Sequence, residues 1–417
     1  MQLSKVVEAE SKYLLSNYQR FPLLVDKGRG CTVYDYSGKR YVDLLAGIAV
    51  NALGYNHPRI NNIFRKQIKK AVHICNLFYH PYQAQLGKRL VELAGLEKAF
   101  FCNSGAEANE AAFKLARGFA YKNFPGQEKH EILTLENAFH GRTYGALSAT
   151  SNEKYRRPFA PLVPGFTFVK PNDVEDLQSK FSDKVCGLIL EPIQGEGGIN
   201  ECTEEFLRMA RQLCDQHQAL LIYDEVQCGI GRTGRYFYFQ KYGIRPDILT
   251  LAKPIALGLP LGALLTTDKA APTFGPGDHG TTFGGGPLTC RIGLEFLRIM
   301  EEENLLERIG ETGAYFKKQL QGLQHKFPFV RDVRGEGLML GVELAFPGRE
   351  IVNRCLEAGF IINCTHDTVL RLLPPYLITR KEINKFIKAL DQIFAGIQAE
   401  QAAAAPSNPP AQGEQAK

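Results

Sequence analysis

The sequence predicts an α/β fold with a mostly parallel central sheet, joined to a smaller domain. Two observations lead to this prediction. Apolar runs of strand length alternate with helix-like segments, and 417 residues are too many for one ordinary core. Strands that alternate with helices are typical of parallel sheets covered by helices. We therefore expect a large sheet-containing domain at residues 51–287.

The N-terminal part is predicted to form a β-hairpin. The segment GCTVYDYSGKRYVDLLAG, residues 30–47, places Ser37 and Gly38 between two strand-like runs. A Ser-Gly pair in this position favours a turn. We expect residues 1–50 to form part of a small domain that residues 288–397 complete.

Six apolar runs are the expected strands of the large domain. They are KAFFCN (98–103), HEILTLEN (130–137), VCGLILEP (185–192), ALLIYDE (219–225), DILTLAK (247–253) and LGALLTT (261–267). The fourth run stays apolar until Asp224 and Glu225, as in a strand buried on both faces. Its acidic end would lie at the carboxyl edge of the sheet, where open α/β folds bind ligands.

The C-terminal part begins with a long helical stretch after Pro287 and ends with a clear last helix. Thr379 and Glu382 form a capping-box pattern, and apolar residues then recur at helical spacing as far as Phe394. From residue 398 onwards only alanine supplies apolar bulk. We therefore expect residues 398–417 to be a disordered tail.

The composition argues against several classes of protein. Hydrophobic residues make up 44% of the chain, as in soluble globular proteins, and the formal net charge of +6 is spread without a basic block. We expect no nucleic-acid partner. Because the sequence has neither a membrane-length apolar run nor a signal-peptide pattern, we expect no membrane association. Ten cysteines without CxxC or zinc-site spacing predict reduced thiols in a cytoplasm and no metal.

The segment NSGAEANEA is a candidate phosphate site. A strand ends before Ser104, and Ser104 with Glu107 fits a capping box at the start of a helix. The free backbone N–H groups and the dipole of such a helix start attract a phosphate. The alternative is an ordinary helix cap.

Two strand ends carry candidate catalytic groups. Lys253 directly follows an apolar run, and a desolvated lysine can act as a nucleophile or base; alternatively, its side chain extends to water. A buried Asp224 needs a cation, either a protonated pyridine nitrogen or an arginine such as Arg232. Glu225 would point to the opposite face of the strand, so we expect a structural role for it.

The segment AFHGRT adds an aromatic ring and a cation. Phe139 could cover a planar ring, and Arg142 could hold a carboxylate in its fork. We interpret His140 as a packed or hydrogen-bonded structural residue. A phosphate-type turn, a ring cover, a strand-end aspartate and a strand-end lysine together are the parts that pyridoxal phosphate requires.

Seven motifs in order make the chain resemble the class-III aminotransferases of the fold-type-I pyridoxal-phosphate family, and most of all the acetylornithine and ornithine aminotransferases. The resemblance runs from about Tyr18 to Phe394. The motifs are GIAVNALGYNHP, NSGAEANEAAFKLAR, FHGRT, EPIQGEGG, DEVQCGIGRTG, LAKP and HGTTFGG. The resemblance implies a mostly parallel seven-stranded sheet flanked by helices, and a small α+β domain from both chain ends.

The resemblance also implies roles for individual residues. Lys253 would bind pyridoxal 5'-phosphate through its amino group and move the substrate proton, and Asp224 would hold the pyridine nitrogen. The other expected cofactor contacts are Gly105 and Ala106 through backbone N–H groups, Phe139 on the ring, Gln227 near the phenolic oxygen, and Thr282 from the neighbouring subunit of a homodimer. The expected substrate contacts are Arg142, Thr281, Tyr18 and a gate formed by Glu196 and Arg371.

Four positions depart from the family pattern. Ala106 stands where threonine or serine is frequent, Ala256 and Leu259 stand where glycine is common, and Gly286 stands where asparagine is common. A backbone contact survives the change at Ala106, but a hydroxyl contact does not. The departures affect specificity and leave the chemistry intact.

We therefore expect a transaminase that moves the terminal amino group of N2-acetyl-L-ornithine to 2-oxoglutarate. The products are N-acetyl-L-glutamate 5-semialdehyde and L-glutamate, as in arginine biosynthesis. The alternative amines are ornithine, succinylornithine, 4-aminobutyrate and a carrier-protein-bound lysine. A non-catalytic regulator with the same fold would not require Lys253, Asp224, Arg142 and Arg371 together. A nucleotide-binding protein would need a GxxxxGK[ST] loop, which the sequence lacks.

Overall fold

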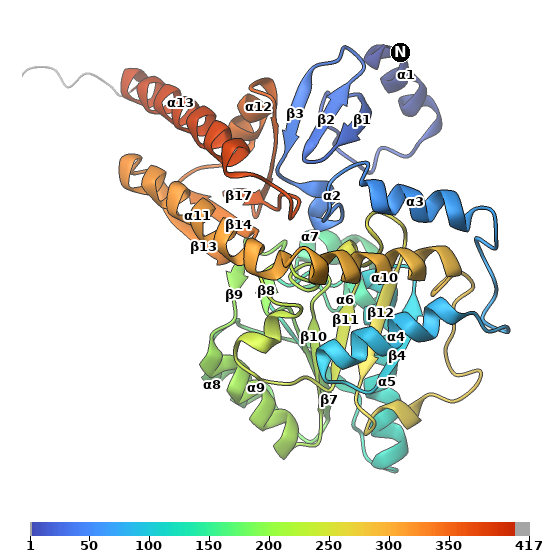
Figure 1. Ribbon diagram of the computed structural model, residues 1–417. Helices are drawn as coiled ribbons and strands as arrows, with labels where there is room; N and C mark the ends of the chain where they lie inside the picture. Colours follow the sequence, from blue (N-terminus) through green and yellow to red (C-terminus); the bar gives the residue numbers. More distant parts are fainter. Residues whose placement is uncertain (1, 405–417) are drawn as a thin grey trace, which may run out of the picture.

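The computed structural model describes residues 2–404 and contains a seven-stranded sheet in its lower part (Figure 1). The spatial order is β4-β12-β11-β10-β7-β5-β6. The strands are β4 (Lys98–Cys102), β5 (Glu131–Leu135), β6 (Phe166–Val169), β7 (Val185–Leu190), β10 (Leu220–Asp224), β11 (Ile248–Leu251) and β12 (Gly262–Thr266). Strand β12 runs antiparallel to both of its neighbours, and the other pairs are parallel. The expected mostly parallel sheet is confirmed.

Helices cover the sheet on both faces, which explains why its strands are apolar throughout. In β10, Leu220 and Ile222 share a core with α5 (Gly105–Asn123). Leu221 and Tyr223 belong to the opposite core, to which α9 (Glu204–Gln216) contributes. All four side chains are fully buried. Because successive strand residues alternate between faces, Asp224 is directed toward α5 and Glu225 away from it.

Figure 1 also shows the remaining helices of the lower part. They are α3 (Pro58–Gln67), α4 (Pro81–Ala94), α6 (Tyr144–Ser148), α7 (Glu153–Arg156), α8 (Val174–Lys180) and α10 (Pro287–Glu302). Helix α10 packs against α3 and α4. A short ribbon of β8 (Ile193–Gln194) and β9 (Asn200–Glu201) follows β7.

One small sheet of the upper part combines both ends of the chain. The predicted hairpin forms β2 (Thr32–Asp35) and β3 (Arg40–Asp43), with β1 (Val25–Arg29) on its outer side. Strand β15 (Phe360–Ile361) comes from the C-terminal part and pairs in parallel with β3. The first helix, α1 (Leu3–Tyr13), precedes this sheet, and the left-handed turn α2 (Ala46–Ala49) follows it.

The second small sheet has the order β13-β14-β17-β16. Its strands are β13 (Val330–Glu336), β14 (Met339–Leu344), β16 (Asn363–Thr365) and β17 (Val369–Leu372). Helix α11 (Leu305–Lys326) packs on β13, and α12 (Arg349–Glu357) packs against α13 (Arg380–Ala404). The small α+β part therefore draws on both chain ends, as expected, whereas the boundaries at residues 50 and 287 stay a prediction.

The last helix begins where expected and ends later than expected. The backbone N–H of Thr379 donates to Glu382, and the N–H of Glu382 donates to the Thr379 hydroxyl, so the capping box is present. Helix α13 continues to Ala404, so the expectation of disorder from residue 398 is wrong for 398–404. Alanine has the highest helix propensity, and Glu400 pairs with Arg354 of α12 at 2.8 Å. Residues 405–417 lie outside the described residues.

Candidate active site

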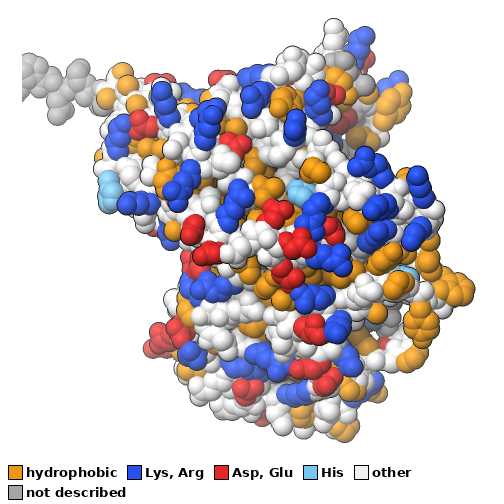
Figure 2. Space-filling view, in the orientation of Figure 1, with side chains coloured by type: hydrophobic (Ala, Val, Ile, Leu, Met, Phe, Trp, Pro, Cys, Tyr) orange, Lys and Arg blue, Asp and Glu red, His pale blue; other side chains and the backbone are white. Residues whose placement is uncertain are grey.

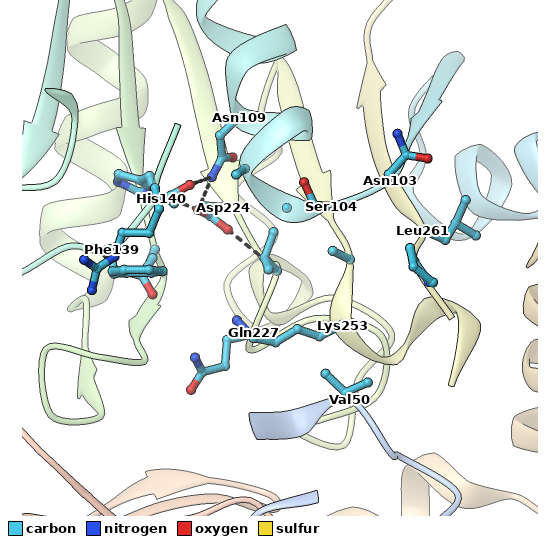
Figure 3. A pocket seen from close by; sticks show the side chains of 18 of the residues that line it. Val50, Asn103, Ser104, Asn109, Phe139, His140, Asp224, Gln227, Lys253 and Leu261 are labelled. Carbon is cyan, nitrogen blue, oxygen red and sulfur yellow. Dashed lines mark hydrogen bonds and ion pairs between the residues drawn. The ribbon is translucent and has the colours of Figure 1, made fainter. Parts of the chain in front are cut away.

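A cavity of about 490 Å³ lies at the carboxyl edge of the large sheet. The chain segments that follow β4, β5, β7, β10 and β11 all reach this edge, because the carboxyl ends of parallel strands meet there. Seven of the residues expected from the sequence line it: Gly105, Ala106, Phe139, Arg142, Asp224, Gln227 and Lys253. Figure 3 shows Lys253 and Gln227 on one side of the cavity and Phe139 with Asp224 on another.

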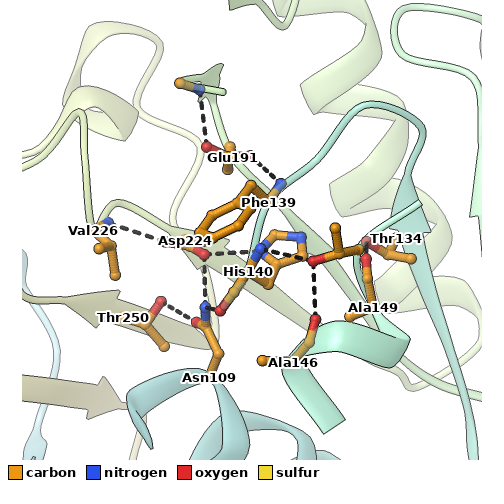
Figure 4. A network of polar contacts seen from close by, with 12 residues as sticks. Asn109, Thr134, Phe139, His140, Ala146, Ala149, Glu191, Asp224, Val226 and Thr250 are labelled. Atoms are coloured by element: carbon orange, nitrogen blue, oxygen red, sulfur yellow. Dashed lines mark hydrogen bonds and ion pairs between the residues drawn. The ribbon is translucent and has the colours of Figure 1, made fainter. Parts of the chain in front are cut away.

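Asp224 ends β10 and is 3% exposed, so its carboxylate depends on hydrogen bonds from the protein. Its Oδ2 atom lies 2.7 Å from His140 Nδ1 and accepts a 2.8 Å bond from the Asn109 side chain. Its Oδ1 atom accepts from the backbone N–H of Val226 at 3.0 Å. Figure 4 shows these contacts around the Asp224 side chain. They leave Oδ1 able to accept one further donor, such as a protonated ring nitrogen.

The expected alternative, an arginine partner for Asp224, is not what the structure contains. Arg232 is fully buried, and its Nη1 atom donates to the backbone oxygens of Leu338 and Pro374. Its guanidinium lies 4.6 Å from the ring centre of Tyr376. Arg232 therefore fastens the loop after β10 to the C-terminal part of the chain.

Glu225 has the structural role expected of it. Its carboxylate accepts bonds from the backbone N–H groups of Tyr238 and Phe239, at 2.6 and 2.8 Å. The residue is 1% exposed, and burial raises the pKa of its carboxyl group to about 8. Its side chain is absent from the cavity lining.

Lys253 follows β11 and lines the cavity beside Gln227. Its φ of 28° is unusual for a residue with a side chain, and such strain is frequent at functional sites. Burial lowers the pKa of its amino group, and the carboxylates of Glu196, Asp224 and Glu191 oppose that effect in part. A lysine with a lowered pKa holds more of its amine uncharged and reactive.

The start of α5 forms the wall near Ser104. The backbone N–H of Glu107 donates to the Ser104 hydroxyl at 3.2 Å, which is one half of the predicted capping box. The Glu107 carboxylate accepts from the backbone and side-chain N–H groups of Asn103. The second bond of a capping box, from the Ser104 N–H to Glu107, is therefore missing. The first N–H groups of a helix have no partner within it. Gly105 and Ala106, which line the cavity, can therefore bind a phosphate.

Two arginines lie at or beside the cavity: Arg142 lines it, and Arg371 Nη1 donates to the lining residue Gln227 at 3.3 Å. Arg371 lies on β17 with its side chain 1% exposed, and its Nη1 atom pairs with the Glu196 carboxylate at 2.5 Å. Burial alone would raise the pKa of Glu196, but Arg371 holds it below its ordinary value. Arg142 is exposed, and its guanidinium lies 3.9 Å from the ring centre of Tyr155. Within residues 2–404, no carboxylate forms an ion pair with Arg142.

Five expected residues are not part of the cavity lining. Glu196 and Arg371 adjoin it through Gln227, whereas Thr281, Thr282 and Tyr18 lie further away. Thr281 accepts a 2.9 Å bond from the Asn103 side chain, and Thr282 beside it is exposed. Tyr18 is 72% exposed, and the guanidinium of Arg20 lies 5.6 Å from its ring centre. One chain alone does not bring these residues to the cavity.

Sequence reasoning missed two residues that shape the site. Asn109 lies on the second turn of α5, and its side chain joins Asp224 to Thr250. Glu191 directly follows β7, as Asp224 ends β10, so the same pattern of an acid after an apolar run could have identified it. The interpretation of His140 as hydrogen-bonded agrees with its contact to Asp224.

The groups around the cavity fit pyridoxal phosphate. The helix start suits its phosphate, the free lone pair of Asp224 suits its ring nitrogen, and the amine of Lys253 suits its aldehyde. Among residues 2–404, no group of three or more metal-ligating side chains occurs.

Comparison with known proteins agrees with this reading of the cavity. A model of the class-III aminotransferase family matches residues 13–394. The chain is 48% identical to the acetylornithine aminotransferase of Methanocaldococcus jannaschii, over 94% of this chain and 98% of that protein. It is 44% identical to the acetylornithine aminotransferase of Aquifex aeolicus, over 92% of this chain and 100% of that protein.

Solved structures share the fold over nearly the whole chain. The ornithine aminotransferase from Toxoplasma gondii ME49 has a TM-score of 0.91 at 31% identity, covering 96% of both chains. The acetylornithine aminotransferase from Elizabethkingia anophelis has a TM-score of 0.85 at 30% identity, covering 95% of this chain and 100% of that one. A second Toxoplasma structure is described with partial occupancy of pyridoxal phosphate at its active site. This chain belongs to the class-III aminotransferases, which have the fold-type-I architecture and use pyridoxal 5'-phosphate.

Proposed function

We propose that this chain transfers the terminal amino group of N2-acetyl-L-ornithine to 2-oxoglutarate, as in arginine biosynthesis. The observation that carries the proposal is the presence of two arginines in one site, of which only Arg371 is neutralised by a carboxylate. N2-acetylornithine has one carboxylate, far from its reacting amine. Glutamate has a second carboxylate beside its reacting amine. A site that binds these two substrates in turn needs one arginine that is always unpaired and one that becomes unpaired only when glutamate enters.

The proposed cofactor contacts follow from the cavity wall. Pyridoxal phosphate supplies an aldehyde carbon that takes up the amino group and a ring that stabilises negative charge beside it. Gly105 and Ala106 would hold the phosphate, and Asp224 would keep the ring nitrogen protonated. Phe139 would cover the ring, and Gln227 would lie near the phenolic oxygen.

Lys253 is proposed as the proton carrier of the reaction. Burial lowers the pKa of its amino group, so the amine can accept a proton from the substrate carbon and return it. His140 and Asn109 fix the Asp224 carboxylate, so that its free lone pair keeps one direction. The protein thus pre-orients both the acid and the base before any substrate enters.

Arg142 and Arg371 are proposed as the substrate clamps. Arg142 would take the distant carboxylate of either substrate. When glutamate enters, its second carboxylate would displace Glu196 from Arg371, and Glu196 can turn away because its side chain is 35% exposed. Such a pair is a two-state switch that the entering substrate biases. Thr281 and Tyr18 are further proposed substrate contacts.

Other members of the family differ from this proposal in the amine alone. Ornithine, succinylornithine, 4-aminobutyrate and a carrier-protein-bound lysine stay alternatives, and ornithine aminotransferases are among the structural neighbours. The cavity wall at Val50, Leu259 and Leu261 is apolar. An apolar wall suits the neutral acetamide of N2-acetylornithine better than the charged α-ammonium of ornithine.

We also propose a cytoplasmic homodimer that binds no nucleic acid. All ten cysteines are free thiols, as a reducing compartment would keep them. Within residues 2–404, no helix combines the length and the apolar character that a membrane crossing requires. Leu77, Phe78, Tyr79 and Phe283 are all more than half exposed, and Figure 2 shows hydrophobic side chains gathered at this edge of the molecule. Exposed apolar patches of this kind mark surfaces that a partner covers.

The amine of Lys253 is expected to react at a lower pH than free lysine. In the apoenzyme, the rate of pyridoxal phosphate binding should follow the uncharged fraction of this amine, with a midpoint below 10.5 because burial lowers its pKa. Glu196→Ala removes the carboxylate that most strongly opposes this effect, so the midpoint should fall further. Stopped-flow absorbance against pH measures both midpoints, with Lys253→Ala as the blank. An upward move in Glu196→Ala contradicts the proposed electrostatics.

An amine panel tests the proposed substrate. We expect kcat/KM with 2-oxoglutarate to be at least about tenfold higher for N2-acetylornithine than for ornithine, because burying the ornithine ammonium against the apolar wall costs about 1.4 kcal/mol or more. Succinylornithine and 4-aminobutyrate complete the panel, and Lys253→Ala should have no turnover with any amine. A higher kcat/KM for ornithine would reassign the substrate, and turnover by Lys253→Ala would refute the mechanism.

The two members of the gate should affect the two half-reactions in opposite directions. Glu196→Ala leaves Arg371 open and should favour the glutamate half-reaction relative to the N2-acetylornithine half-reaction. Arg371→Ala should impair the glutamate half-reaction by roughly 2–5 kcal/mol, the scale for truncating one partner of a buried charge pair. Single-turnover rates separate the half-reactions. Equal losses in both half-reactions for both variants would indicate a static ion pair.

Subunit mixing tests whether Thr282 serves the partner's cofactor. Thr282→Asp would place a negative charge beside the partner's phosphate and should inactivate the homodimer. A mixed dimer of Lys253→Ala and Thr282→Asp chains should regain activity, because one of its two sites then has both native residues. If mixing restores nothing while native mass spectrometry of differently tagged chains shows mixed dimers, Thr282 acts within its own subunit. An active monomer would exclude a shared site.

A further inference from the structure

One buried carboxylate holds two separate loops of the site. Glu191 follows β7 and is 4% exposed. Its Oε1 atom accepts a 2.9 Å bond from the backbone N–H of Phe139, and its Oε2 atom accepts a 3.0 Å bond from the backbone N–H of Gly195. Figure 4 shows Glu191 between its two donors, with Phe139 on one side. A second side chain also joins these parts of the chain, because Gln194 Nε2 donates to the Glu136 carbonyl at 2.7 Å.

The second loop carries the proposed gate, and its backbone is held at three points. The N–H of Gly195 donates to Glu191, and the carbonyl of Gly195 accepts from Arg371 Nη1 at 3.2 Å. The carbonyl of Glu196 accepts from the Thr365 hydroxyl at 2.6 Å. The Glu196 side chain, in contrast, is 35% exposed. The backbone is therefore fixed, whereas the side chain is paired with Arg371 and is partly open to solvent.

We propose that Glu191 is a positioning residue that ties the ring cover at Phe139 to the gate at Glu196. By holding Gly195, it confines the opening of the gate to a rotation of the Glu196 side chain. It also keeps the Gly195 carbonyl in place as a hydrogen-bond acceptor for Arg371. This inference rests on the proposed function, because the gate belongs to it.

The chemistry of Glu191 makes a specific substitution informative. Burial and the nearby Asp224 raise the pKa of its carboxyl group to about 7. Above neutral pH the group is therefore ionised, and both oxygens can accept hydrogen bonds. A glutamine has almost the same shape, but only its oxygen accepts, and its amide nitrogen would face a backbone N–H. Glu191→Gln therefore removes one of the two hydrogen bonds and weakens the other, which is no longer charge-assisted, without opening a cavity.

Glu225 supplies a matched control. It is also buried, and its carboxylate also accepts from two backbone N–H groups, those of Tyr238 and Phe239. It adjoins Asp224 at the end of the neighbouring strand β10, but its side chain does not line the cavity. Glu225→Gln thus makes the same chemical change beside the site rather than within it.

The experiment compares the two variants as holoenzymes above pH 7. Hydrogen exchange of the peptides that contain Phe139 and Gly195 should be faster in Glu191→Gln than in the parent, and unchanged in Glu225→Gln. The KM for glutamate should rise about tenfold in Glu191→Gln, the effect of losing one charge-assisted hydrogen bond. The KM for N2-acetylornithine should rise less, because its proposed binding uses Arg142 and does not require Arg371. Thermal stability should fall in both variants.

Three outcomes would overturn the inference. They are unchanged exchange at Gly195 in Glu191→Gln, equal changes of KM for both substrates, and effects that Glu225→Gln reproduces. If Glu191→Gln does not fold, Glu191→Asp keeps the charge and two acceptors on a shorter side chain, and it should change the same quantities to a smaller extent. The parent separates this inference from the proposed function: a parent without a glutamate half-reaction refutes the function, whereas the exchange data test the role of Glu191 alone.

Discussion

The site depends on one constraint, the cost of keeping the Asp224 carboxylate in the interior of the protein. A buried charge is tolerated only where donors surround it. His140 and the Asn109 side chain meet one oxygen of Asp224, and the backbone of Val226 meets the other. These donors come from three different parts of the chain, so the position of the carboxylate is fixed only when the whole sheet edge has formed. Removing any of them would leave part of that charge uncompensated.

The large sheet brings these groups together because its strands are nearly all parallel. Carboxyl ends of parallel strands lie on one edge, so polar residues that follow separate apolar runs become neighbours. Asp224 and Glu191 illustrate this: each stands at the end of a buried strand, and β10 and β7 pair directly. The two acids differ in their roles. Asp224 keeps one lone pair that can accept from a ligand, whereas both oxygens of Glu191 accept from backbone N–H groups.

The fold and the main chemical groups were predictable, because they depend on local pattern. Buried strands are recognisable in the sequence as apolar runs. Asp224 and Lys253 are recognisable because each is a charged residue at the end of such a run. Asn109 was not predictable, because a polar residue within a helix gives no sign of what it faces. The position of Thr282 could not be predicted either: it is exposed here, and its proposed role is in the site of a second chain. The helix at 398–404 was missed because low apolar content was taken as disorder, although alanine favours helix and Arg354 meets Glu400.

The pairing of β15 with β3 has a consequence for biosynthesis. Phe360 and Ile361 are the parallel neighbours of Val42 and Asp43. The edge of β3, which is synthesised early, therefore stays unpaired until β15 is synthesised. At ordinary ribosomal speed, that delay is on the order of tens of seconds. During this interval the hairpin edge has open hydrogen-bonding groups, and such edges attract other chains. A chaperone that covered this edge would therefore protect the nascent chain until its last strands have left the ribosome.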